Sequence, residues 1–193
     1  MIPGSTSTAL KEWSVTVDAL EKGQQILLLR KGGIRETNRH FQVDHGGFFL
    51  YPTHYHEWEY LLKPDVRTQL NQVNVDEEAD FVLLSVYATV TDIIEVKEKP
   101  QVLSLDRFHI WTPKYVENRL NWNPTHPLQL LLLRCYRLVT PISVPVMPEY
   151  GGCQSWVELL EQYPLGESRQ VLLEHEFQRQ VAEIKTTLTE TVE

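Results

Sequence analysis

Apolar residues occur in short dense runs, and these runs predict most of the strands. Residues 25–31 (QILLLRK) and 128–145 (LQLLLLRCYRLVTPISVP) are predicted as strands buried on both faces. Residues 48–52 form a further short strand, and residues 81–99 are densest in β-branched and aromatic side chains. Because 19 residues are many for one strand, we expect a bend or bulge at 88–91.

The segments between these runs predict helices. Apolar residues recur at steps of three and four between Thr8 and Gly23, which indicates an amphipathic helix that the glycine ends. Thr53 is the expected N-cap of a second helix that reaches Lys63. Pro113 is expected in the first turn of a third, shorter helix.

The C-terminal part predicts two more helices and completes the domain organisation. Residues 151–164 are expected to contain a helix of one or two turns, and 167–188 an amphipathic helix that packs on the domain or on a partner. We expect one globular domain over 8–163, with disorder at 1–7 and 189–193. The elements lack regular βαβ alternation, so the predicted fold is α+β: a bent mixed sheet or partly closed β-barrel with flanking helices.

Composition and charge narrow the possible functions. The chain has 193 residues and a formal net charge of −8, which is unlike a generic nucleic-acid binder. The charge is unevenly distributed, because residues 30–39 carry four cations and one acid, and residues 101–140 carry five cations and two acids. An acidic protein of this kind can still present one basic face.

The cysteines and the N-terminal sequence indicate the cellular compartment. Only Cys135 and Cys153 occur, and the N-terminal sequence MIPGSTSTALKEW does not resemble a signal peptide. The longest apolar run is far shorter than the ~20 residues that cross a bilayer. The sequence therefore predicts a cytoplasmic protein without a membrane span.

Five motifs along the chain together resemble a bacterial family of domains of unknown function. They are ALKEW, LLLRKGGI, HIWTPKYVENRLNW, LLLLRCYRL and YGGCQSWVEL, and the resemblance extends to about residue 160. The family implies no particular activity.

A more remote resemblance concerns the opening of the chain and one later strand. A helix containing Ala19-Leu20, then Gly23 and a strand ending in Arg30, is similar to the opening of PUA-like folds, especially the ASCH group. The segment LNWNPTHPLQLLLLRCYRLVTPISVP resembles their closing strand. The resemblance implies a small β-barrel that binds RNA or modified bases in a cleft. Gln25 stands where many relatives have lysine, so a contact carried over to that position is in doubt.

Two segments supply the candidate ligand-binding residues. The first ends a buried strand before two glycines, where Arg30, Lys31 and Arg35, with Arg39 nearby, could converge on a phosphate or carboxylate. The alternative is a solvated turn whose cations pair with the protein's acids.

The second segment alternates aromatic and basic side chains, which could stack on a base and hold its phosphate. Here the alternative is that the aromatic residues are core anchors. The residues of this second segment are His109, Trp111, Tyr115, Arg119 and Trp122. The leading hypothesis is a non-catalytic recognition module without a cofactor, which binds RNA, single-stranded or modified DNA, or a nucleotide-like anion.

Other chemistries remain open at this point. Asp65, Glu95 and Lys97 are similar to the PD-(D/E)XK pattern, which would make the protein a Mg²⁺-dependent nuclease. His54 and His56 could suggest a metal site, although on a helix they would point about 200° apart. A third hypothesis is a protein-interaction module that binds a partner or itself through the C-terminal helix.

Overall fold

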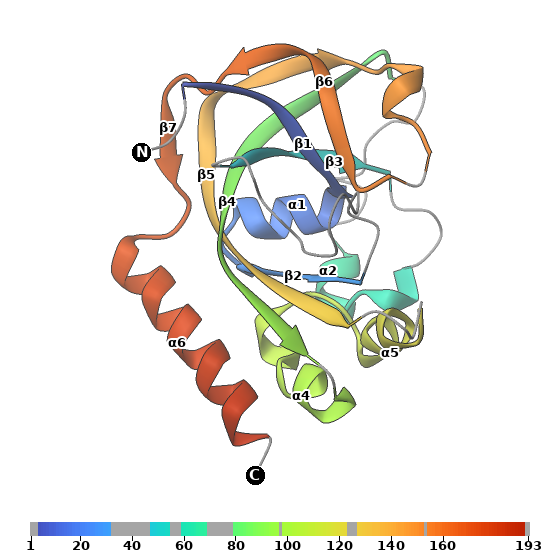
Figure 1. Cartoon of the computed structure of the whole chain (residues 1–193), viewed down its shortest axis with the longest axis vertical. Helices are drawn as coiled ribbons and strands as arrows, with labels where there is room; N and C mark the ends of the chain where they lie inside the picture. The colour runs from blue at the N-terminus through green and yellow to red at the C-terminus, as the bar shows by residue number, and fades with distance from the viewer. Residues whose placement is uncertain are drawn as a thin grey trace.

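The computed structural model describes residues 4–31, 47–54, 59–68, 79–96, 98–122, 127–152 and 154–191. Within these residues, seven strands form one bent sheet in the order β2-β5-β4-β3-β1-β6, and β7 pairs with β5 (Figure 1). β1 and β3 pair in parallel and the other pairs are antiparallel, so the sheet is mixed, as predicted. The strands are β1 Ser5–Trp13, β2 Leu27–Arg30, β3 Phe48–Thr53, β4 Phe81–Val96, β5 Leu128–Pro145, β6 Trp156–Pro164 and β7 Ser168–Gln170.

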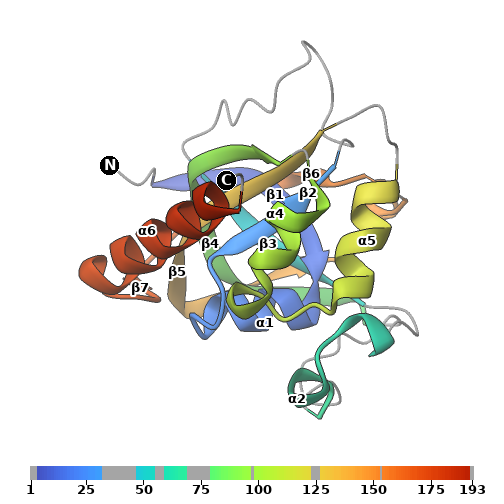
Figure 2. The ribbon, with the colours of Figure 1, turned by 90° about the horizontal axis from the view of Figure 1, so that it is seen from below.

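Helices fill the curve of the sheet and cover one of its ends. α1 lies inside the curve, while α4 and α5 lie side by side below it and α6 runs along the outside (Figures 1 and 2). The helices are α1 Ser14–Glu21, α2 Pro64–Arg67, α4 Lys99–Ser104, α5 Pro113–Asn121 and α6 Glu174–Glu190, with 3₁₀ turns η1 Glu59–Leu61, η2 Asp106–Phe108 and η3 Pro148–Tyr150. The architecture is α+β with flanking helices.

The two longest strands form the backbone of the fold. β4 and β5 pair antiparallel from Phe81↔Pro145 to Val96↔Leu128. The register shifts twice, between Leu84 and Val86 and between Val90 and Asp92. Such bulges bend a strand, and the second one lies at the predicted bend. The predictions of both strands from their dense apolar runs are confirmed.

Alternation along the strands divides the buried residues between two clusters. Phe48 and Phe49 are adjacent in β3 and fully buried, yet Phe48 packs with α1 and β2, while Phe49 packs with Tyr87 and the residues of β6. Successive side chains of a strand point to opposite faces, so both faces of this sheet are covered. The prediction that the apolar strands are buried on both faces is confirmed for β2, whose four residues are all buried.

The predicted helix from Thr8 is wrong in its first half. Residues Ser5–Trp13 form β1, where Ala9 and Leu10 pair with β3 on one side and β6 on the other. The spacing of Leu10 and Trp13 fits a helix equally well, and pairing with two neighbouring strands decides the outcome. The helix is limited to Ser14–Glu21, and Gly23 follows it with φ +69°, as expected of a helix stop.

Two other helix predictions are wrong. Residues 151–164 were expected to include a short helix, but Trp156–Pro164 is the edge strand β6. Thr53 is not an N-cap, because it belongs to β3 and its hydroxyl donates to the Glu12 carbonyl at 3.1 Å. In the described part of 54–63, helical structure is limited to the η1 turn.

The C-terminal helix is confirmed, but it begins later than predicted. β7 occupies the start of the expected range, and α6 begins at Glu174. The buried residues of α6 are Phe177, Val181, Ile184 and Leu188. Glu174 of α6 also lies 3.0 Å from the Arg134 guanidinium, and Lys185 donates to Asp92. The apolar face of α6 therefore packs on its own domain and is not free for a partner.

Candidate functional site

Helix α5 presents one chemically distinct face. Pro113 occupies its first turn, as predicted, because a proline there costs no helical hydrogen bond. Tyr115, Arg119 and Trp122 follow at steps of four and three, with Asn118 between them on the same face. The helix ends at Asn121, and the Trp122 ring stays 53% exposed. The confirmed helix therefore aligns three of the predicted site residues.

A pocket of about 590 Å³ lies against this face. Among the described residues, its walls come from α5, from the residue before α1 and from η1. The lining residues are Trp13, Leu61, Tyr115, Asn118, Arg119, Asn121 and Trp122. Such a volume lies within the range of small-molecule sites, and its mixture of rings, amides and one cation is typical of them.

The side chains at the base of the pocket hold one another in place. The Tyr115 ring stacks on Trp111, with centroids 4.7 Å apart, and meets the Trp13 ring edge-on at 5.5 Å. Arg119 donates from Nε to the Tyr115 hydroxyl at 3.0 Å, and its guanidinium carbon lies 5.1 Å from the Tyr115 ring centroid. Orientations fixed in this way reduce the entropy that a ligand must remove on binding.

The two predicted basic segments meet at this site. Lys31, just after β2, donates from its ammonium to the Leu120 carbonyl of α5. The positive charge of Arg30 also acts on Tyr115, where it lowers a pKa that burial raises. Residues about 90 positions apart in the chain are thus neighbours, as the hypothesis requires.

The two described cations of the first basic segment, however, bind internal partners. Arg30 is 8% exposed and donates from Nη2 to Glu12 Oε2 and to the Lys11 carbonyl, each at 2.8 Å. Lys31 is 5% exposed and is fixed on α5. The expectation that both contact a ligand directly is at odds with this burial. Arg35 and Arg39 lie outside the described residues.

His109 and Trp111 are also interior residues. Both are buried, and their rings lie 5.3 Å apart, with Trp111 continuing the stack to Tyr115. Both residues therefore lie where the alternative interpretation, in which the aromatic residues are core anchors, places them. Their effect on the pocket passes through Tyr115, which is itself buried, so the more accessible members of the predicted set among the described residues are Arg119 and Trp122.

The sequence analysis missed four residues that line the pocket. Asn118 and Asn121 could have been found, because they share a face of the predicted helix with Tyr115 and Trp122. Trp13 and Leu61 come from distant segments that only the tertiary fold brings together.

Comparison with known proteins establishes the family. The family model described as Domain of unknown function (DUF1802) matches residues 9–183. The chain belongs to this family. No curated protein matches the DUF1802 chain. It is similar to two crystal structures of ASCH from Zymomonas mobilis, each at 12% sequence identity. For a mutant form, the TM-score is 0.47 and the match covers 94% of this chain and 99% of that chain. For the other structure, the TM-score is 0.45 and the coverage 91% and 93%.

The buried histidine makes the stability of this DUF1802 domain depend on pH. Burial lowers the pKa of His109 from its usual 6.5 to about 4, and the nearby Lys63 charge adds to the decrease while Asp106 opposes it. The unfolded chain therefore binds the proton more readily than the folded protein between these two pH values. The contribution of the neutral His109 to the free energy of unfolding is fully present above pH ~6.5, and it decreases as the pH falls towards ~4.

We expect His109 to account for a loss of about 3 kcal/mol in unfolding free energy between pH 7 and pH 4. Urea denaturation at a series of pH values measures this loss. His109→Asn should flatten the profile, whereas His175→Asn, at an exposed position of α6, should leave it unchanged. A profile that His109→Asn does not alter would contradict the assignment.

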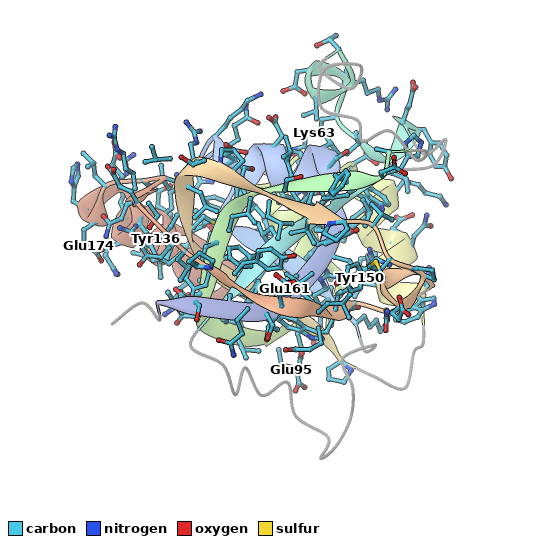
Figure 3. The ribbon with its side chains drawn as sticks, turned by 90° about the horizontal axis from the view of Figure 1, so that it is seen from above. Lys63, Glu95, Tyr136, Tyr150, Glu161 and Glu174 are labelled. Atoms are coloured by element: carbon cyan, nitrogen blue, oxygen red, sulfur yellow. The ribbon has the colours of Figure 1, made fainter. Side chains whose placement is uncertain are left out.

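The nuclease hypothesis lacks its geometry in the DUF1802 structure. Asp65 lies in the first turn of α2, and Glu95 is the penultimate residue of β4. Figure 3 shows Lys63, which precedes α2, and Glu95 on opposite sides of the molecule. Two carboxylates must approach one Mg²⁺ in such enzymes, and this pair does not. Lys97 lies outside the described residues.

The described residues contain neither a cluster of metal ligands nor a membrane-spanning helix. Within them, no three His, Cys, Asp or Glu side chains lie close enough to hold a metal ion. His54 lies within them, whereas His56 and Cys153 do not. None of the helices in this part of the DUF1802 chain has both the length and the apolar character that a membrane crossing requires.

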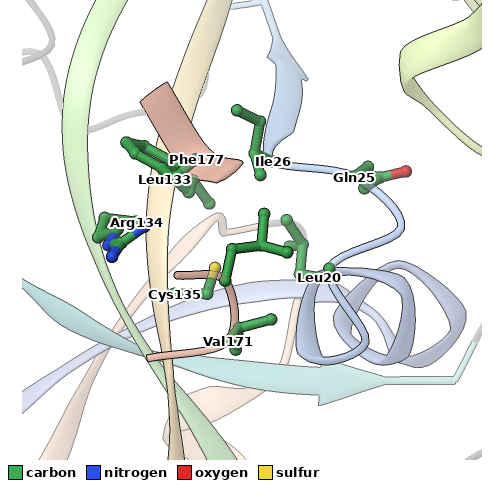
Figure 4. A pocket seen from close by; sticks show the side chains of 10 residues that line it. Leu20, Gln25, Ile26, Leu133, Arg134, Cys135, Val171 and Phe177 are labelled. Atoms are coloured by element: carbon green, nitrogen blue, oxygen red, sulfur yellow. The ribbon is translucent and has the colours of Figure 1, made fainter. Parts of the chain in front are cut away.

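A second, much smaller hollow lies between α1, β5 and α6 (Figure 4). Its volume is about 10 Å³, enough for about one water molecule. Burial raises the pKa of the Cys135 thiol beside it to about 12, so this cysteine stays protonated and unreactive. The hollow is a packing gap of the core and offers no space for a ligand.

Proposed function

We propose that the domain is a recognition module that binds single-stranded nucleic acid, or a nucleotide-like anion, in the α5 pocket. The observation that carries the proposal is the pocket of about 590 Å³ that is lined by Tyr115 and Arg119 of α5 and by Trp122, which directly follows the helix. The half-exposed Trp122 ring would stack on a base, and the Arg119 guanidinium would bind a phosphate oxygen.

The charge of the lining supports an anionic ligand. The chain as a whole is acidic, with a net charge of −8. Among the described residues that line the pocket, however, the one charged side chain is the cation Arg119. No carboxylate of the described part of the chain forms an ion pair with Arg119. Asn118 and Asn121 add amide groups that can both donate to and accept from the edge of a base.

The aromatic lining of the pocket favours an unpaired base. The exposed ring of Trp122 offers a flat face for stacking, and a base inside a duplex cannot leave its stack without breaking its pairing. The remote resemblance to PUA-like folds, which often bind RNA or modified bases in a cleft, points to the same ligand class. The proposed ligand is therefore a single strand of nucleic acid, and RNA is preferred to DNA.

Fluorescence anisotropy with labelled 12-nucleotide single strands of RNA and DNA, at two salt concentrations, tests this proposal. We expect Trp122→Ala to weaken binding about tenfold or more, because stacking on one aromatic ring contributes about 1–3 kcal/mol per base. Arg119→Gln should weaken binding and reduce the slope of log K against log salt by about 0.7, the value for one phosphate contact on a single strand.

Two matched variants control for general effects on surface and charge. Leu160→Ala removes an exposed apolar side chain from β6, and Arg169→Gln removes an exposed cation from β7, far from α5 in Figure 1. Both should bind as the wild type does. Equal binding by the wild type, Trp122→Ala and Arg119→Gln would show that this pocket is not the site.

A further inference from the structure

A buried ion pair lies directly behind the pocket wall. Glu12, near the end of β1, accepts from Arg30 Nη2 at 2.8 Å through one oxygen and from the Trp13 backbone N–H at 2.9 Å through the other. Both side chains are almost fully buried. The carboxylate thus joins β2 to the residue whose ring forms part of the pocket.

The charge of Glu12 reaches the side chains that a ligand would meet. The pKa of Arg119 is raised by Tyr115 and, against the effect of burial, by Glu12. The pKa of Tyr115 is raised by burial, lowered by Arg119 and raised again by Glu12. In a poorly solvated site such charges interact more strongly than they would in water.

The side chains of Glu12, Arg30 and Arg119 form what we call the floor of the pocket, and their charges can be counted from these contacts. Arg30 and Arg119 contribute two positive charges, and Glu12 is the carboxylate that acts on both. Lys31 is bound to the Leu120 carbonyl at the C-terminal end of α5, whose partial negative charge offsets part of its own. Glu117 faces away and pairs with Lys99 of α4. Without the carboxylate of Glu12, the net charge of the floor would therefore be more positive by one.

We propose that Glu12 is a specificity-determining residue, which limits the positive charge beneath Arg119 so that the pocket favours an anion with a single charge. A phosphodiester within a strand carries one charge, whereas a terminal phosphate carries nearly two at neutral pH. The preferred ligand is then an internal nucleotide of a strand rather than a free nucleotide. This inference rests on the proposed function of the pocket.

Two ligands that differ by one charge test the inference. Adenosine 5′-monophosphate and its phosphate methyl ester share base, ribose and phosphate, but the ester carries a single negative charge. Calorimetric titration at pH 7.5 gives the ratio of their dissociation constants. The wild type should bind the ester at least as tightly, and Glu12→Gln should shift the ratio about five- to tenfold towards the monophosphate.

A double variant separates charge from structure. Glu12→Gln combined with Arg30→Gln removes both charges of the pair and restores the count on the floor. It should return the ratio of dissociation constants to that of the wild type. A merely structural role of Glu12 would weaken both ligands equally in the single variant and leave the ratio unchanged.

The outcomes distinguish this inference from the function on which it rests. If neither ligand nor any labelled strand binds the wild type, the proposed function fails. If strands bind, but the wild type favours the monophosphate, or the single variant Glu12→Gln has the same ratio as the wild type, the role of Glu12 is overturned. Should Glu12→Gln fail to fold, the wild-type ratio still decides the question, because a preference for the monophosphate overturns the role of Glu12 and a preference for the ester supports it.

Discussion

Replacing Arg30 with alanine is expected to lower the free energy of unfolding by about 3–5 kcal/mol, because Glu12 would remain charged and buried without its partner. The guanidinium donates to the carboxylate and to the Lys11 carbonyl, so the substitution also leaves a main-chain acceptor without its donor. The loss is large because the pair ties the ends of β1 and β2 together beneath the pocket.

Urea or thermal denaturation measures this loss, and an exposed ion pair provides the control. Arg137 contacts Glu21 at 3.1 Å, but its side chain is 53% exposed. Arg137→Ala should cost about 1 kcal/mol or less. The double variant Glu12→Gln with Arg30→Gln should be more stable than Arg30→Ala, since no buried charge remains. An Arg30→Ala protein as stable as Arg137→Ala would contradict the burial of this pair.

The second large effect is expected for Trp111→Ala, which should destabilise the protein by about 3–5 kcal/mol. Trp111 is fully buried, and its backbone forms an isolated bridge to Leu62. Its ring supports Tyr115 from below at 4.7 Å, so removal leaves a cavity directly under the pocket. Unfolding free energy from denaturation measures the effect, and Trp111→Phe should recover part of it.

The neighbouring Trp122 provides the matched control for Trp111. Both residues flank α5, but the Trp122 ring is half exposed. Trp122→Ala should change the unfolding free energy by about 0.5 kcal/mol or less while weakening ligand binding. A stability loss of similar size in both variants would mean that the two rings do not have the different roles assigned to them.

Elements with a strong local pattern could be predicted from the sequence. β2, β4 and β5 are dense in β-branched and leucine residues, so their apolar runs identify them without knowledge of their partners. α5 is similarly local, because Pro113 sets its first turn. β2 and α5 carry Arg30, Tyr115 and Arg119 of the predicted site.

Elements that depend on distant partners could not be predicted. Residues Ser5–Trp13 form a strand because β3 and β6 are available on both sides, and Trp156–Pro164 forms β6 because β1 offers an edge. Neither segment alone favours a strand strongly. The internal ion pair of Arg30 could not be predicted for the same reason, since its partner Glu12 is 18 residues away on another strand.

The indole N–H signals of the tryptophans test the central claim most directly. Titration of the ¹⁵N-labelled protein with an unlabelled 12-nucleotide single strand should shift the signal of Trp122, assigned with Trp122→Phe, and that of Trp13 on the pocket wall. The signal of the buried Trp111 should move less. Shifts confined to Trp156 of β6, or no shift of Trp122 at saturating strand, would contradict a nucleic-acid site in the α5 pocket.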